Sequence, residues 1–154
     1  MREIKALYEQ YSADVYRFAL YLCGDQSVAE DITADTFTRL LTHKSEVITE
    51  TVKAYLLTIA RNLFLEHKRR ESRYQDTPTQ ETLGQSLEAS FLEHKQIMQV
   101  FSILQSLNVN DRALLLLRAE GVTYEDISKI LGISQAAAKV KIHRLRKNMI
   151  IKFK

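Results

Sequence analysis

Lysine and arginine side chains gather on one segment near the end of the chain, where their type and spacing suit contact with phosphate oxygens. Residues 135–147 carry five of them, together with Gln135 and His143. Cations bind the backbone of nucleic acids, while polar side chains can hydrogen-bond to base edges in the major groove. At helical spacing, Gln135, Lys139 and His143 share one face. These residues therefore predict a surface that reads nucleic acid.

Other chemistry has little support in the sequence. The histidines are scattered without metal-ligand spacing, at His43, His67, His94 and His143. Cys23 is the only cysteine, so no internal disulfide is possible, and no glycine-rich phosphate loop exists. We therefore expect a protein that is not an enzyme and that has no metal site, no catalytic residue and no cofactor.

The basic surface requires a pair of helices to position it. Thr123 with Asp126 resembles a capping box, Gly132 suits a left-handed helix stop, and Ser134 can cap the helix that follows. That second helix would bury one stripe at spacings of four, three and four, made of Ala138, Ile142, Leu145 and Met149. This pattern favours a helix-turn-helix whose second helix enters the major groove. The alternative is a helical hairpin with a merely solvated basic face.

Charge is distributed in alternating blocks along the 154 residues, although the net charge is only +3. Residues 1–52 have a net charge of −4, 53–75 of +4, 76–96 of −3 and 97–154 of +6. Two basic blocks suggest two contacts with a polyanion, and the acidic blocks suggest a surface for another protein. Neither a signal peptide nor an apolar run of membrane-spanning length is present, so we expect a cytoplasmic protein without membrane insertion.

Helical periodicity with a single proline and four glycines predicts an all-α fold. We expect two small helical domains, residues 1–74 and 93–154, joined by a flexible linker at 75–92 that holds the only proline. The expected helices are 3–23, a second from Asp25 or Ser27 to about Thr42, then 51–70, 91–107, and 111–120 with Asn110 as its cap. The helix at 51–70 has an inner stripe beginning at Val52 and an exposed basic side. Its aromatics Tyr55 and Phe64 are interpreted as core residues, although rings near cations can also stack on unpaired bases.

Three motifs in order resemble those of the extracytoplasmic-function group of bacterial sigma factors. Residues 29–37, AEDITADTF, resemble the polymerase-binding helix of that family. Residues 54–62, AYLLTIARN, are similar to its helix that reads melted promoter DNA, and residues 107–145 resemble its closing helix-turn-helix. The resemblance covers nearly the whole chain.

The resemblance implies a sigma factor that binds core RNA polymerase and directs promoter-specific initiation, and it implies three sets of contact residues. The polymerase-binding set is Asp31, Asp35, Thr38 and Arg39. The set that captures melted minus-10 DNA is His43, Lys44, Lys53, Arg61, Asn62, Arg69 and Arg70. The set that reads the minus-35 duplex is Gln135, Lys139, Lys141, His143, Arg144, Arg146 and Lys147. The implied partners are core RNA polymerase, promoter DNA and an anti-sigma factor.

A stand-alone helix-turn-helix regulator is the alternative function. Such a protein would bind duplex DNA by itself, and it would leave the acidic residues 31–35 and the second basic block without a role.

Overall fold

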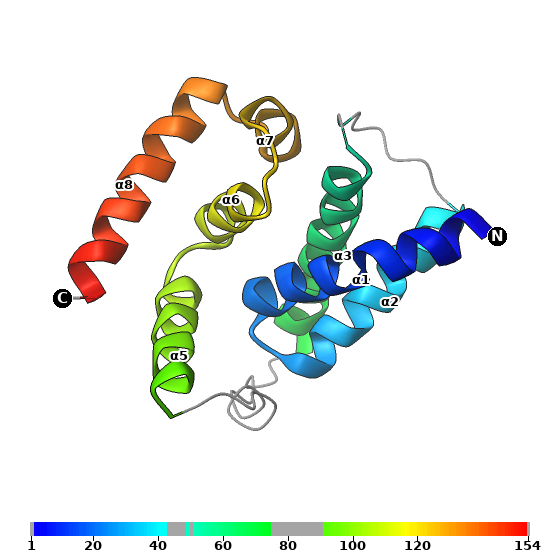
Figure 1. Ribbon diagram of the computed structural model, residues 1–154, viewed down its shortest axis with the longest axis horizontal. Coiled ribbons are helices and arrows are strands. Elements are labelled where there is room, and N and C mark those ends of the chain that lie inside the picture. Colours follow the sequence, from blue (N-terminus) through cyan, green and yellow to red (C-terminus); the bar gives the residue numbers. More distant parts are fainter. Residues whose placement is uncertain (1, 43–48, 50, 75–90, 154) are drawn as a thin grey trace.

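The computed structural model describes residues 2–42, 49, 51–74 and 91–153, and every regular element within these ranges is an α-helix (Figure 1). The predicted all-α, two-domain architecture is confirmed. Most of the predicted linker lies outside the described residues, and Phe91 and Leu92 belong to the helix predicted at 91–107. None of the described helices is long and apolar enough to cross a membrane.

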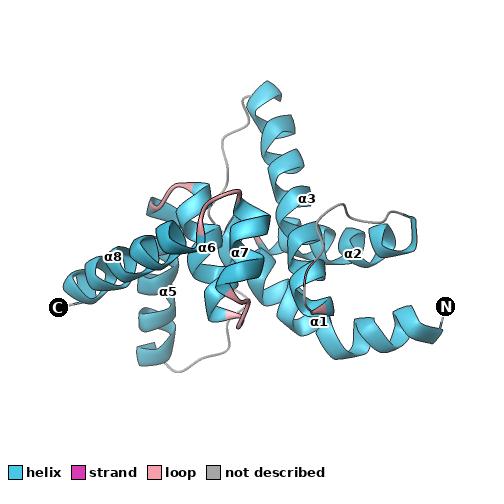
Figure 2. Cartoon of the chain, turned by 90° about the horizontal axis from the view of Figure 1, so that it is seen from above, coloured by secondary structure: helices cyan, strands magenta, loops and turns pink. Residues whose placement is uncertain are grey.

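Three helices form the N-terminal domain and four form the C-terminal domain. The first three are α1 (Arg2–Cys23), α2 (Gln26–Thr42) and α3 (Val52–Tyr74). The other four are α5 (Phe91–Ser106), α6 (Val109–Ala119), α7 (Tyr124–Leu131) and α8 (Gln135–Phe153). Figure 2 shows the two groups side by side, and α1 packs against α5 and α6 while α3 packs against α6.

The turn between α1 and α2 is tight. Gly24 has a φ of 79°, and its amide donates to the Leu20 carbonyl at 2.8 Å. The next residue, Asp25, caps α2 by accepting a hydrogen bond from the Val28 amide at 3.2 Å. Of the two predicted starts, Asp25 is therefore correct. Ser27, the other predicted start, already lies inside the helix.

The long helix α3 begins at Val52 and runs four residues beyond the predicted end at Arg70. Thr51 caps it by accepting a hydrogen bond from the Ala54 amide at 3.1 Å. Leu56 and Leu63 are buried, but Val52, which was predicted to begin the inner stripe, is 44% exposed. The inner stripe therefore starts one turn later than its periodicity suggested.

The cap of α6 also differs from the prediction. Asn108, not Asn110, is the N-cap, and its side chain accepts a hydrogen bond from the Asp111 amide at 2.9 Å. Asn110 lies inside the helix, two residues after the cap. The leucines at 114–117 are buried as expected.

One arginine is buried where the two domains meet. Arg112 of α6 is 6% exposed, and its Nε donates to the Leu104 carbonyl at 2.8 Å. Its two terminal nitrogens donate to the carbonyls of Leu107, at 3.0 Å, and of Leu22 at the end of α1. The last carbonyls of a helix have no partner within the helix, so this side chain satisfies the ends of α5 and α1 together. Burial lowers the pKa of Arg112 from its ordinary value.

Candidate nucleic-acid interface

The helix-turn-helix forms as its sequence predicted. Thr123 accepts a hydrogen bond from the Asp126 amide at 3.1 Å, and Ser134 accepts one from the Ala137 amide at 3.0 Å. Between them, Gly132 ends α7 in the left-handed conformation with a φ of 68°. Ser128 adds a side-chain bond to the Ile133 carbonyl at 2.6 Å, which ties the turn to α7. These local bonds fix where α8 begins relative to α7.

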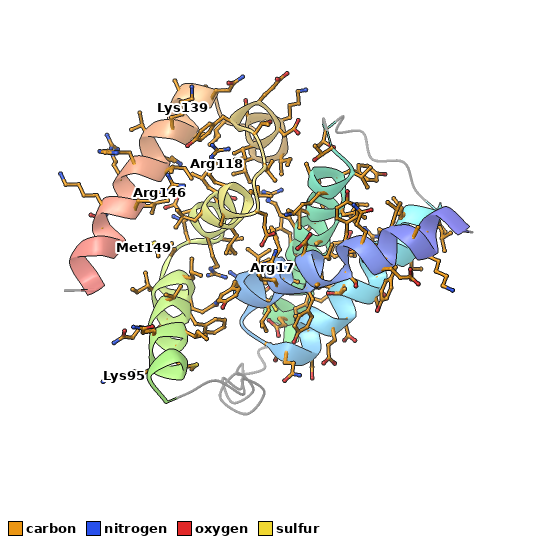
Figure 3. The ribbon with its side chains drawn as sticks, in the orientation of Figure 1. Arg17, Lys95, Arg118, Lys139, Arg146 and Met149 are labelled. Carbon is orange, nitrogen blue, oxygen red and sulfur yellow. The ribbon has the colours of Figure 1, made fainter. Side chains whose placement is uncertain are left out.

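Burial divides α8 into an inner and an outer surface. Ala138 and Ile142 are buried, and Leu145 and Met149 are half-buried against the same core. All seven predicted duplex-contact residues are exposed: Gln135, Lys139, Lys141, His143, Arg144, Arg146 and Lys147. Figure 3 marks Lys139 near the start of α8 and Arg146 further along it. The structure therefore brings these residues together on one solvent-facing helix.

Three of the seven residues lie on two different sides of α8. Lys139 extends toward α7, where its Nζ lies 5.5 Å from the centre of the Tyr124 ring. Lys141 and Arg144 instead line an open groove of about 670 Å³ beside the start of α6, with Leu65 of α3 on the opposite wall. In this arrangement the groove side of α8 is directed toward the N-terminal domain.

Sequence reasoning missed a second cation on Tyr124. Arg118 places its guanidinium carbon 4.4 Å from the ring centre and donates to the Val122 carbonyl at 3.0 Å (Figure 3). Cations stack favourably on aromatic faces, so Tyr124 connects α6 to the recognition helix through Arg118 and Lys139. The sequence feature that could have indicated this contact is the aromatic residue directly after the Thr123 cap.

On the N-terminal domain, the exposed face of α2 is acidic. Asp31 and Asp35 border a groove of about 360 Å³, and Arg70 and His67 of α3 form its other side. Arg70 was predicted to contact DNA, but it lies beside the predicted polymerase-binding residues. A mixed acidic and basic groove with an apolar floor suits a protein partner.

The remaining two predicted polymerase contacts have intramolecular partners. Arg39 forms a two-point ion pair with Glu66 of α3, at 2.9 and 3.1 Å. The pair raises the pKa of Arg39 and lowers that of Glu66, in both cases mainly through the hydrogen bonds between them. Thr38 is exposed and donates to the Ala34 carbonyl at 3.0 Å. Arg39 therefore helps to hold α2 against α3.

The predicted minus-10 residues differ in how accessible they are. Asn62, Arg69 and Arg70 are exposed on α3, whereas Arg61 is half-buried. Burial lowers the pKa of Arg61, and its Nε has no hydrogen-bond partner among the described residues. His43 and Lys44 lie outside the described residues. Of the two aromatics interpreted as core residues, Phe64 is buried and Tyr55 is half-buried.

Lys53, another predicted minus-10 residue, is engaged by the C-terminal domain. Its Nζ lies 3.1 Å from Oε1 of Glu120 and 3.7 Å from Oδ2 of Asp14. Arg17 binds the same Glu120 carboxylate at 2.7 and 2.8 Å. Arg17, Asp14 and Glu120 were not singled out in the sequence, because their spacing along the chain gives no sign that they meet.

The described residues offer little for catalysis or metal binding. They include no group of three or more His, Cys, Asp or Glu side chains placed to hold a metal ion. Cys23 donates to the Asp25 carbonyl at 3.3 Å, and burial raises its pKa to about 11. A thiol with such a pKa is rarely deprotonated at neutral pH, so Cys23 is a poor nucleophile.

Comparisons with known proteins match both halves of the chain to the same protein family. The family model of Sigma-70 region 2 matches residues 7–74, and that of Sigma-70 region 4 matches residues 97–149. The ECF RNA polymerase sigma factor SigL of Mycobacterium tuberculosis is 30% identical over 154 residues, covering 91% of this chain and 82% of that protein. The ECF RNA polymerase sigma factor SigX of Bacillus subtilis is 27% identical, covering 93% and 81%.

Solved structures share the fold. The sigma factor RpoE of Bartonella quintana, solved in complex with the anti-sigma factor NepR, has a TM-score of 0.72 and 22% identity. The alignment covers 99% of this chain and 98% of that one. The structure of CnrH with the cytosolic domain of CnrY has a TM-score of 0.66 and 20% identity, with coverage of 97% and 86%.

Proposed function

We propose residue-level roles from one premise, namely that this chain belongs to the extracytoplasmic-function (ECF) group of RNA polymerase sigma factors. As a sigma factor it binds core RNA polymerase and directs promoter-specific initiation. A stand-alone regulator is not favoured, because the region 2 match occupies residues 7–74, outside the helix-turn-helix. In our proposal the polymerase performs the chemistry, and this chain contributes binding alone.

The exposed basic face of α8 is the observation that carries the DNA-binding part of the proposal. Gln135, Lys139 and His143 would meet base edges in the minus-35 duplex. Phosphates would be held by Lys141, Arg144, Arg146 and Lys147. The bonds of Thr123, Gly132 and Ser134 described above support this assignment, since they hold α8 in one orientation with its apolar side buried.

The N-terminal domain would divide two tasks between its helices. The exposed acids Asp31 and Asp35 on α2, with Thr38 and Arg39 beside them, would dock on core polymerase. The minus-10 strand would be captured by the basic side of α3, through Lys53, Arg61, Asn62, Arg69 and Arg70, together with His43 and Lys44. Unstacking a base costs a few kcal/mol, which contacts to a flipped base can offset.

An anti-sigma factor is the proposed regulatory partner. The proteins of known structure with this fold include two solved in complexes, one with the anti-sigma factor NepR and one with the cytosolic domain of CnrY. The exposed acidic face of α2 and basic face of α8 are two surfaces that such a protein could cover. Purification of the chain from its native cells under non-inducing conditions should therefore yield a stable complex.

Reconstitution tests the function itself. Core polymerase alone and core polymerase with this chain would each transcribe the bacterium's genomic DNA, and the 5′ ends of the transcripts would be sequenced. We expect discrete start sites that depend on the chain, each preceded by shared minus-35 and minus-10 sequences. Start sites that are the same with and without the chain would refute the proposal.

Separate effects are expected from two substitutions on α8. Arg146→Ala should weaken holoenzyme binding about equally on all its promoters. It should also make the slope of log affinity against log salt concentration shallower by about one, the change expected for one lost phosphate contact. Lys139→Ala should instead change the ranking of promoters, with about a tenfold loss at those that have its preferred base. Binding would be measured over a salt series, with Lys129→Ala on α7 as the matched control because Lys129 pairs with Glu125. Equal effects of Lys139→Ala and Arg146→Ala on every promoter would contradict the assignment.

A further inference from the structure

Glu120 of the C-terminal domain is held by two cations of the N-terminal domain. Arg17 of α1 donates hydrogen bonds to both carboxylate oxygens, at 2.7 and 2.8 Å, and Nζ of Lys53 on α3 lies 3.1 Å from one of them. Arg17 also bonds Asp14 at 2.7 Å, which fixes its guanidinium in place. We call these four residues, Asp14, Arg17, Lys53 and Glu120, the Glu120 cluster. Figure 3 shows Arg17 on the side of α1 that faces α6.

The Glu120 cluster is partly buried between the domains. The side chain of Glu120 is 8% exposed, that of Lys53 26% and that of Arg17 50%. Two-point binding of a carboxylate by arginine is the strongest form of this contact. Burial alone would raise the pKa of Glu120, but the hydrogen bonds from Arg17 and Lys53 outweigh it and lower the pKa. The carboxylate is therefore charged and depends on the N-terminal domain for its partners.

A second set of contacts closes the same interface. Arg112 and Gln105 donate to the carbonyls of Leu22 and Tyr21, the Gln105 bond measuring 2.9 Å. These two carbonyls lie in the last turn of α1, where the helix offers no partner of its own. Phe101 packs beside Tyr21, with 6.0 Å between ring centres. Polar and apolar contacts thus join the domains at the end of α1.

The closed arrangement conflicts with the proposed mode of promoter binding. Elements at minus-35 and minus-10 are separated by about 25 base pairs, or roughly 85 Å of duplex at 3.4 Å per pair. A domain of this size is roughly 28 Å across, so two touching domains span less than about 60 Å. In addition, the pairing of Lys53 with Glu120 competes with any contact between Lys53 and a phosphate. The span of the promoter therefore requires the domains to separate before the two elements are bound.

We propose that the Glu120 cluster is an autoinhibitory latch: Glu120 occupies Lys53 in place of DNA and holds the chain in a closed form that must open for promoter recognition. This inference rests on the proposed function, since it takes the minus-10 role of Lys53 from it. The chain between Tyr74 and Phe91 has 16 residues and can extend to at most roughly 55 Å, which permits the separation. Opening the latch is then part of the cost of binding polymerase and DNA.

The test uses the full chain and the charge reversal Glu120→Arg. We expect a larger radius of gyration by X-ray scattering and about tenfold tighter binding to core RNA polymerase, because more molecules are already open. Glu120→Gln, which keeps the side-chain shape, should act in the same direction and serves if the reversal impairs folding. The double variant Arg17→Glu/Glu120→Arg restores a pair of opposite charges and should return both measurements toward those of the original chain.

Glu125→Arg is the matched control, because Glu125 is an exposed acid of the same domain whose ion pair, with Lys129, lies within α7. It should leave the radius of gyration and the affinity unchanged. The latch is refuted if Glu120→Arg and Glu120→Gln change neither measurement, or if Glu125→Arg changes both equally. Failure of the original chain to bind core polymerase would refute the proposed function instead, and the scattering series would still decide whether Glu120 holds the domains together.

Discussion

Replacing Arg112 by methionine is expected to lower the free energy of unfolding by about 3 kcal/mol. The methionine fills much of the space but cannot donate to the carbonyls of Leu104, Leu107 and Leu22, which Arg112 binds in the buried interior. Each buried acceptor left without a partner costs about 1–3 kcal/mol, and removing a desolvated charge offsets part of that loss. Urea denaturation followed by circular dichroism would measure the change.

Two further variants separate the mechanism from a simple loss of charge. Arg112→Lys keeps the charge, but one ammonium group cannot reach carbonyls on both α5 and α1, so an intermediate loss is expected. Arg146→Met removes an exposed arginine of the same domain and should change stability by less than about 0.5 kcal/mol. If Arg112→Met cost no more than Arg146→Met, the buried hydrogen bonds would not be the source of stability.

Reversing the two exposed acids of α2 should have the largest effect on polymerase binding. With Asp31→Lys/Asp35→Lys, we expect the affinity for core RNA polymerase to fall about a hundredfold, because like charges that face each other across an interface cost several kcal/mol. Both residues border the groove between α2 and α3, and neither side chain is needed for the core. Titration of labelled core polymerase would give the affinities.

The control for this experiment makes the same change in net charge elsewhere. Glu9→Lys/Glu125→Lys reverses two exposed acids, one on α1 and one on α7. Its affinity for core polymerase should stay within about threefold of the original chain, since screening limits the reach of distant exposed charges. Similar losses in the two double variants would mean that net charge, and not the α2 surface, governs binding.

The element pattern was predictable wherever neighbours along the chain determine it. The stop at Gly132 and the caps at Thr123 and Ser134 depend on bonds that span three or four residues, and all formed as expected. The buried stripe from Ala138 to Met149 followed from periodicity alone. For the same reason the exposed basic surface of α8 could be identified from residue types and helical spacing.

Local prediction failed where two side chains compete for one role. Asp25 and Ser27 both suit the cap of α2, and Asn108 and Asn110 both suit that of α6. In each case the residue that comes earlier in the chain is the cap. Periodicity likewise placed Val52 in the core, although the first turn of α3 is exposed to solvent at this residue. Such choices depend on the path of the chain just before the helix, and the sequence of the helix does not specify that path.

The sequence by itself determined the helices, the two-domain organisation and the basic and acidic surfaces, because composition and periodicity act over one or two turns. Only the tertiary structure decided how the charged residues are used. Arg17 meets Glu120 across 103 positions of the chain, and Arg112 meets Leu22 across 90. Lys53 and Arg39, which the sequence offered as surface contacts, have internal partners for the same reason. A buried hydrogen bond depends on which helix ends packing brings together, and no local pattern records that.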